Sequence, residues 1–285
     1  MAPFIQLGVV RIYTFGLMMG LSFCVAYWLG DVYFRRHNMR TSMSLMLPAV
    51  VAAGLIGSKV DGFLVLEALL RHRRLADMSW SGFISTDYIF FGGLVCGALA
   101  ALAIFHARGI PLAEALDAAP IVAICYGIGR IGCLLAGDGD YGIPTSLPWG
   151  MTFPHGIVPT LVRVHPNPIY QTIYAGVIFL VLWPQSIAKD YPRRPRGSIG
   201  VDTFLWMGIC RFATEFISRN HKFFAGLTEA QWVSVVLIIG MLVLRQRLDR
   251  PTRSRQVSNH AQSMTHIAKL RLLAACPPKL DKARD

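Results

Sequence analysis

Residues 118–142 read AAPIVAICYGIGRIGCLLAGDGDYG, a long apolar run that ends in a glycine-rich loop. A helix needs about 20 mostly apolar residues to cross the hydrocarbon core of a bilayer. The run at 118–136 has that length and contains one charged residue, Arg130. We therefore predict a membrane-spanning helix with an arginine inside it, followed by a loop that carries Asp138 and Asp140.

The same apolar character recurs along the chain. Of its 285 residues, 54% are hydrophobic and 15% are charged, whereas about 25% of the residues are charged in soluble domains. Seven stretches are predicted to be spans: 9–29, 45–70, 88–106, 118–136, 169–187, 199–217 and 230–244. The prediction is an all-α polytopic membrane protein, a bundle of about seven transmembrane helices with an extracytoplasmic cap loop.

The basic residues indicate how this bundle is oriented, because Lys and Arg are enriched in cytoplasmic loops. With the N-terminus outside, the inner loops carry eight of these residues and the C-terminal tail ten, against seven on the outer side. We predict an outer N-terminus and a cytoplasmic C-terminus, a choice that depends on the tail and on KDYPRRPR at 189–196. The first run is long enough to remain as a span instead of being cleaved as a signal peptide.

The composition changes near the C-terminus and suggests two parts. Residues 1–244 form the predicted transmembrane domain, with the cap loop at about 137–168. Residues 245–285 contain ten basic and three acidic residues, which supply +7 of the net charge of +12. We predict a disordered, cytoplasmic tail that lies near anionic lipid. Nucleic-acid binding is disfavoured because no aromatic residue lies among these charges.

Three ionisable residues inside predicted spans indicate a functional cavity, since such groups face the bundle interior or water. Arg130 lies in the fourth span, and Arg211 and Glu215 lie four residues apart on one face of the sixth. Guanidinium groups bind phosphate through a planar fork, and the abundant phosphate of a membrane is the lipid head group. The alternative is that Arg211 and Glu215 form a purely structural ion pair. The second span also contains Lys59, Asp61 and Glu67, for which a functional and a structural role both stay open.

The glycine loop after Arg130 is suited to line such a cavity. Irregular backbone at membrane depth is tolerated where it lines a cavity, and glycine allows close approach of a ligand. We predict Asp138 or Asp140 at the cavity mouth, with a solvated loop as the alternative. The Pro- and Gly-rich cap loop that follows contains His155 and His165, which the sequence favours as turn contacts over catalysts.

Six segments together resemble the bacterial prolipoprotein diacylglyceryl transferase family. YGIGRIGCLLAGDGDYG is similar to its signature segment. In the same order along the chain, VRIYTFGLMMGLSF, FFGGLVCG, HPNPIYQTIY, RFATEFISRN and GLTEAQWVS are similar to other family segments. The resemblance covers residues 10 to 244 and leaves out only the tail.

The resemblance implies an enzyme of the bacterial cytoplasmic (inner) membrane with seven transmembrane helices. Its reaction transfers the diacylglyceryl group of phosphatidylglycerol to the lipobox cysteine thiol in the signal peptide of a prolipoprotein. A thioether forms and glycerol 1-phosphate leaves, in the first step of lipoprotein maturation. The family needs no metal or soluble cofactor, and the partners it implies are these two substrates and membrane lipid, with no nucleic acid.

The resemblance also implies roles for individual residues. Arg130 and Arg211 hold the phosphate of phosphatidylglycerol and stabilise the charge of the leaving group. Asp138 falls where the family has a glutamate, and Glu215 lies on the helix of the second arginine. Each of these two is predicted either to orient an arginine or to help remove the thiol proton. Further predicted substrate-binding residues are Gly137, Asp140, His165 and Tyr170.

The chain departs from the family pattern at several polar positions. Phe15, Phe91 and Met207 stand where members have tyrosine or histidine, and none can do acid–base work. Asparagines or a glutamate of the family pattern are replaced at Cys133, Ala136 and Gln171. Two hypotheses follow: an active transferase, or a divergent member that binds lipid or modifies another acceptor. A transporter is a third, disfavoured because the sequence has no evident repeat symmetry.

Overall fold

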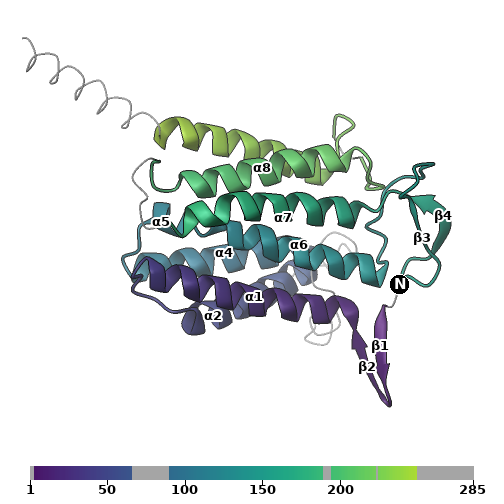
Figure 1. Cartoon of the computed structure of the whole chain (residues 1–285), viewed down its shortest axis with the longest axis horizontal. Helices are drawn as coiled ribbons and strands as arrows, with labels where there is room; N and C mark the ends of the chain where they lie inside the picture. Colours follow the sequence, from purple (N-terminus) through teal and green to yellow (C-terminus); the bar gives the residue numbers. More distant parts are fainter. Residues whose placement is uncertain (1–2, 66–89, 189–193, 223, 249–285) are drawn as a thin grey trace, which may run out of the picture.

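The computed structural model describes residues 3–65, 90–188, 194–222 and 224–248. Long helices lie side by side in this part of the chain (Figure 1), and each predicted span overlaps one of them within the described residues. The all-α polytopic prediction is confirmed. The long helices are α1 (Thr14–Arg36), α2 (Met43–Val65), α4 (Phe90–Ala107), α6 (Ala119–Ala136), α7 (Asn167–Ser186), α8 (Ser198–Glu215) and a last helix (Glu229–Leu248).

The surface of the helices is that of a membrane protein. Trp28, Leu180 and Val236 are 65%, 70% and 69% exposed, although large apolar groups on this scale are rarely left in water. Four segments, 14–36, 43–62, 112–136 and 229–248, are long and apolar enough to cross a membrane. The apolar helix of 92–107 is shorter. The chain is therefore organised for lipid on its outside and polar contacts within the bundle.

The prediction that the first span begins at residue 9 is wrong. Strands β1 (Phe4–Leu7) and β2 (Val10–Tyr13) form an antiparallel hairpin, in which Phe4 is the partner of Tyr13. The VRIY segment alternates apolar and polar residues and is rich in β-branched side chains, a strand pattern. Helix α1 begins after it at Thr14, whose N–H and hydroxyl both donate to the carbonyl of Pro3.

Close packing of α2 against α4 explains one of the charges in the second span. A Cβ at Gly57 would lie 2.5 Å from the carbonyl oxygen of Gly92, so only glycine allows this approach. The N–H of Gly92 donates to Asp61 Oδ2 at 2.9 Å. This contact supports the structural reading of Asp61. Glu67 lies outside the described residues.

One end of the bundle is tied together by Asp117, which follows the short helix α5 (Leu112–Leu116). Its carboxylate accepts hydrogen bonds from the N–H groups of Gly197, Ile199 and Gly200, and so caps the first turn of α8 from another segment. Nearby, Asp202 pairs with Arg194 and Arg245. These contacts fix α8 and the last helix lengthwise, which sets the position of Arg211.

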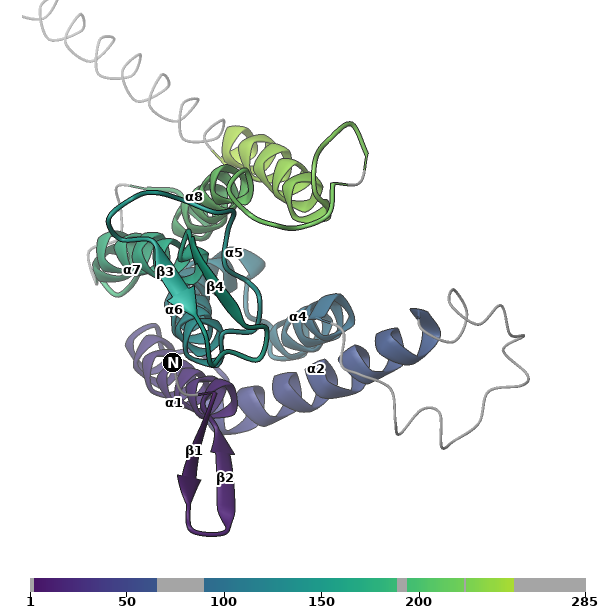
Figure 2. The ribbon, with the colours of Figure 1, turned by 90° about the vertical axis from the view of Figure 1, so that its right-hand side faces the viewer.

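The cap loop folds at the opposite end of the bundle, seen end-on in Figure 2. Strands β3 (Met151–Phe153) and β4 (Thr160–Val164) pair in an antiparallel manner, with an irregular register between Met151 and Phe153. Beneath them Tyr141, Phe153 and Val164 are buried together, with the rings of the first two stacked at 4.9 Å. The cap loop is therefore an ordered part of the structure.

Candidate active site

Helix α6 ends in a turn that requires glycine. Gly137 has a φ of 58° in the left-handed region, and its N–H donates to the carbonyl of Cys133 at 2.9 Å. A Cβ there would lie 2.7 Å from the Cα of Gly156. Two cap-loop amides, of Ile157 and Val158, donate to the carbonyls of residues 136 and 137. These contacts hold the loop of 137–142 against the rest of the cap. The role they show for Gly137 is to allow this close packing.

Arg130 points toward this loop and pairs with Asp140. Its Nη1 lies 2.6 Å from Asp140 Oδ2 and donates also to the Sγ of Cys133 at 3.4 Å. The Arg130 side chain is 16% exposed, and its Nε is buried without an acceptor among the described residues. An unmatched buried donor is costly. The guanidinium therefore retains one N–H whose hydrogen no described residue accepts.

Asp138 lies beside this pair, and among the described ion pairs Arg130 is matched by Asp140 and not by Asp138. Its Oδ1 accepts a hydrogen bond from the N–H of Asp140 at 3.2 Å. Burial raises the pKa of the Asp138 carboxyl above its usual range, and the like charge of Asp140 adds to the rise. Of the two predicted aspartates, Asp140 thus neutralises Arg130, and Asp138 is the one whose proton affinity is increased.

The same aspartates and Cys133 have their donor atoms within 4.8 Å of one another, a spacing compatible with a metal ion. Asp140 already pairs with Arg130, and the guanidinium would repel a second cation beside it. We therefore assign this group to the arginine and not to a metal.

Arg211 and Glu215 form an ion pair along α8. Arg211 Nη1 lies 2.7 Å from Glu215 Oε2, although not as an aligned hydrogen bond. The Glu215 side chain is fully buried, and its other oxygen accepts from Asn220 Nδ2 at 2.5 Å and from the hydroxyl of Thr228 at 3.0 Å. The hydrogen bonds from Asn220 and Thr228 fix the orientation of this carboxylate beside Arg211. The geometry favours an orienting role for Glu215 over proton removal.

Thr228 belongs to a capping box that starts the last helix. Its N–H donates to Gln231 Oε1 at 2.9 Å, and the Gln231 N–H donates to the Thr228 hydroxyl oxygen at 3.3 Å. The same hydroxyl reaches Glu215, so the start of one helix supports the arginine of another. Sequence reasoning missed this contact, although the Thr-x-x-Gln spacing in GLTEAQ was a readable signal.

Two tyrosines near the arginines were also missed. The hydroxyl of Tyr174 on α7 donates to that of Tyr126 on α6 at 3.3 Å. Tyr126 lies within electrostatic range of Arg130, and Tyr174 within that of Arg211. The available signal was the four-residue spacing of Tyr126 and Arg130, which places them on one helix face.

His165 and Tyr170 form a separate polar group where β4 joins α7. His165 Nδ1 lies 3.2 Å from the Tyr170 hydroxyl, which also accepts from Trp149 Nε1 at 2.8 Å. The backbone of His165 pairs with that of Ile143 and Gly142. No described contact joins either side chain to Arg130 or Arg211, so their predicted role in substrate binding stays a prediction. His155 is exposed on the cap.

Three of the positions that depart from the family pattern pack against described parts of the bundle. Phe15 lies against Gly132 of α6, where an added Cβ would be 3.2 Å from its ring. Met207 packs with Tyr174 against a buried cluster of α6, α7 and α8. Gln171 is 1% exposed, and its Oε1 has no partner among the described residues. The side chain of Phe91 lies outside what the structure describes.

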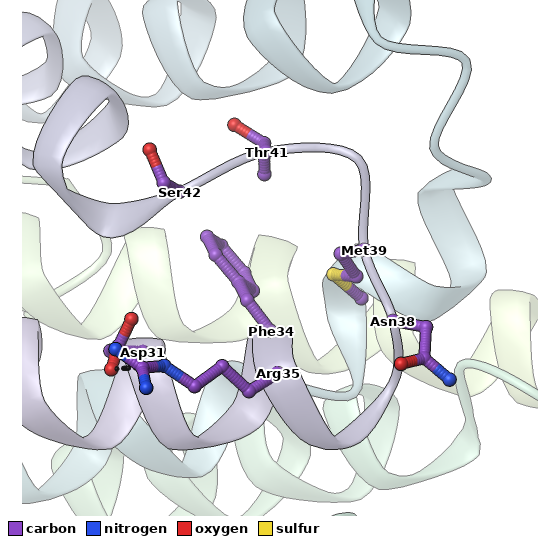
Figure 3. Close-up of a pocket in the computed structure, with 7 residues that line it drawn as sticks. All are labelled: Asp31, Phe34, Arg35, Asn38, Met39, Thr41 and Ser42. Atoms are coloured by element: carbon purple, nitrogen blue, oxygen red, sulfur yellow. Dashed lines mark ion pairs between the residues drawn. The ribbon is translucent and has the colours of Figure 1, made fainter.

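A cleft at the other end of the bundle contains none of the predicted site residues. It has a volume of about 540 Å³ and lies where α1 turns toward α2 (Figure 3). Its ion pair is internal, with Arg35 Nε 2.8 Å from Asp31 Oδ2. The cleft is lined by Asp31, Phe34, Arg35, Asn38, Met39, Thr41 and Ser42.

The fold and the site define a class: a polytopic membrane protein with arginines on two packed helices, α6 and α8, below a structured cap. A family model described as prolipoprotein diacylglyceryl transferase matches residues 3–246. The chain belongs to this family.

Individual relatives agree with the family match. A phosphatidylglycerol–prolipoprotein diacylglyceryl transferase of Pseudomonas putida is 30% identical over 256 residues, which are 84% of this chain and 91% of the relative. One of Azotobacter vinelandii is 32% identical over 253 residues, 83% and 89% of the two chains. One of Nitrosospira multiformis is 29% identical over 270 residues, 88% of each. The family and the apolar helices make this a bacterial membrane protein.

Proposed function

We propose that the chain transfers the diacylglyceryl group of phosphatidylglycerol to the lipobox cysteine of prolipoproteins. One observation carries the proposal beyond the names of its relatives. Arg130 and Arg211 lie on neighbouring helices, and the Nε of Arg130 is a buried donor without an acceptor among the described residues. A phosphate bound between the helices would provide the missing acceptor.

The proposed chemistry uses these groups on the leaving side of the reaction. The cysteine sulfur forms a bond to the glycerol carbon of the diacylglyceryl group, and the bond from that carbon to the phosphate oxygen breaks. The bonding electrons leave with glycerol 1-phosphate, whose negative charge Arg130 and Arg211 stabilise. Asp140 orients Arg130 at 2.6 Å, and Glu215 orients Arg211 at 2.7 Å.

The nucleophile needs to lose its proton, because the thiolate is the reactive form of cysteine. Asp138 is our candidate for the acceptor. Burial raises the pKa of its carboxyl, and a base works best when its pKa is near the operating pH. Its place on the loop that is fixed by Gly137 would hold it at the mouth of the site.

The site also has consequences for the arrangement in the membrane. We propose that residues 1–244 are the transferase domain of a protein of the cytoplasmic membrane, with the cap at 137–168 outside and the basic tail of 245–285 inside. Support comes from the charge distribution along the sequence. A prolipoprotein signal peptide and phosphatidylglycerol would then meet at the capped end of the bundle.

Complementation tests this function. A bacterial strain depleted of its own transferase would be supplied with the chain, with Arg130→Gln, or with the control Arg35→Gln, which removes an exposed cation at the other end of the bundle. Rescue by the chain and by Arg35→Gln, but not by Arg130→Gln present at comparable level, is expected. Failure of the wild-type chain to rescue, while it accumulates in the membrane, would contradict the proposal.

A further inference from the structure

The hydroxyls of Tyr126 on α6 and Tyr174 on α7 join the first arginine helix to the helix that packs against the second. Helix α7 packs against both α6 and α8, and the three run side by side in Figure 1. The tyrosine rings are stacked with their centroids 6.2 Å apart and their planes 23° apart. Their hydroxyl oxygens lie 3.3 Å from each other.

Each tyrosine is associated with one of the arginines. Tyr126 lies one helical turn before Arg130 on the same face of α6, within its electrostatic range. Tyr174 is in electrostatic range of Arg211 on α8. The polar groups therefore follow one another as Arg130, Tyr126, Tyr174 and Arg211 across three helices.

Two hydrogen-bond donors among these four side chains have no acceptor in the described protein. A pair of hydroxyls joined by one hydrogen bond keeps one O–H unused, whichever of the two donates. With Tyr174 as the donor, the hydroxyl hydrogen of Tyr126 has no acceptor among the described residues. The buried Nε–H of Arg130 also has no acceptor among the described residues. Two unmatched donors one turn apart favour a ligand with several acceptor oxygens.

The apolar neighbours make the tyrosines more important for such a ligand. Met207, which faces the same packing cluster as Tyr174, has no hydrogen to donate. Tyr126 and Tyr174 are both only partly buried, so the described protein leaves part of each side chain uncovered. An uncharged donor between two cations allows an anion to approach without adding to their mutual repulsion.

We propose that the Tyr126–Tyr174 pair is the hydroxyl part of the head-group site and donates a hydrogen bond to the phosphate of phosphatidylglycerol held by Arg130 and Arg211. The inference rests on the proposed function and adds two binding residues to it. A phosphate held by the pair would lie beside the helices of both arginines, so that both can act on one leaving group.

The test uses Tyr126→Phe, Tyr174→Phe and the double variant, which keep the rings and remove only the hydroxyls. Transfer of the diacylglyceryl group to a lipobox peptide is measured at increasing phosphatidylglycerol concentration. Loss of one hydrogen bond to a charged group predicts that the KM for phosphatidylglycerol rises about tenfold in each single variant. Because the two hydroxyls act as one unit, the double variant should lose much less than the product of the two single losses.

Tyr33→Phe is the matched control. Its buried hydroxyl donates to the carbonyl of Glu114 at 2.7 Å near the other end of the bundle, so this variant should keep the KM even if the melting temperature falls. A second readout is the rise in melting temperature caused by short-chain phosphatidylglycerol in detergent, which should shrink in the Tyr126 and Tyr174 variants and persist in Tyr33→Phe.

The outcomes separate this inference from the function on which it rests. A wild type without transfer would refute the proposed function. An active wild type whose Tyr126→Phe and Tyr174→Phe forms keep the KM within twofold would refute the tyrosine role alone. So would variants that lose only melting temperature, as the control does, with unchanged response to phosphatidylglycerol.

Discussion

Replacing Arg130 separates its proposed role in binding phosphate from a role in stability. Lysine keeps the positive charge and can still pair with Asp140, but it lacks the planar fork and the Nε–H that has no acceptor in the described protein. Removing one preorganised donor from the charge that develops in a transition state costs about 10²–10³ in rate. We therefore expect kcat of Arg130→Lys to fall about a hundredfold.

The surroundings of each arginine predict how the protein level responds. Asp140 is 43% exposed, so water can solvate it when Arg130→Gln removes its partner, and the protein should accumulate normally. Glu215 is 0% exposed, and a buried ion that loses its partner costs about 3–5 kcal/mol. Arg211→Gln should therefore lower the amount of folded protein as well as the activity. The hydrogen bonds that Asn220 and Thr228 donate to Glu215 remain and offset part of this cost.

The assay measures transfer per folded molecule, with folded protein quantified by size-exclusion chromatography in detergent. Arg35→Gln is a suitable control, because that arginine is 81% exposed and lines the distant cleft. The reasoning is refuted if Arg130→Lys and Arg130→Gln keep full activity per folded molecule. Loss of folded protein in Arg130→Gln, with normal specific activity in the remainder, would show that the pair with Asp140 is structural.

Three further outcomes are expected. Thr228→Val removes the capping hydroxyl, which is also a donor to Glu215, so the unfolding free energy should fall by about 1 kcal/mol and the transfer rate should decrease. An unchanged melting temperature and activity would contradict this role of Thr228. If the carboxylate of Asp138 takes the thiol proton, activity should fall as the pH decreases through its raised pKa, at a higher pH than the value of about 3.9 for an ordinary aspartate. An acidic limb that persists unchanged in an active Asp138→Asn form would exclude this role. Reporter fusions at Leu147 and Arg250 should report outside and cytoplasm respectively, and the reverse result would overturn the orientation.

The sequence predicted the helices well because length and hydropathy respond to one strong requirement, the satisfaction of backbone groups in lipid. The apolar run around Arg130 was placed at 118–136, and α6 spans Ala119–Ala136. The error at the N-terminus has a local cause. The apolar stretch of 9–29 includes the segment VRIY. This segment has the alternating pattern of a strand and pairs with residues 4–7 in a hairpin, so it is not part of the helix.

The site was predicted in part, because side-chain partners depend on packing that a single sequence does not contain. Both arginines were found as charges inside spans, and the pairing of Arg211 with Glu215 followed from helical spacing. The choice of Asp140 over Asp138 as partner of Arg130 depends on the turn at Gly137, which has no periodic signal. The tyrosine pair requires knowledge of how α6 and α7 face each other.

The central claim is that the two arginines act on the phosphate of a lipid whose diacylglyceryl group is transferred to a cysteine. The direct measurement incubates the purified protein with phosphatidylglycerol and a lipobox peptide, and determines by mass spectrometry both the lipidated peptide and the released glycerol 1-phosphate. We expect one glycerol 1-phosphate for each thioether, none with a peptide whose cysteine is replaced by serine, and a large loss with Arg130→Lys. Lipid binding without either product would contradict the claim, as would a peptide labelled equally well by the Arg130→Lys form.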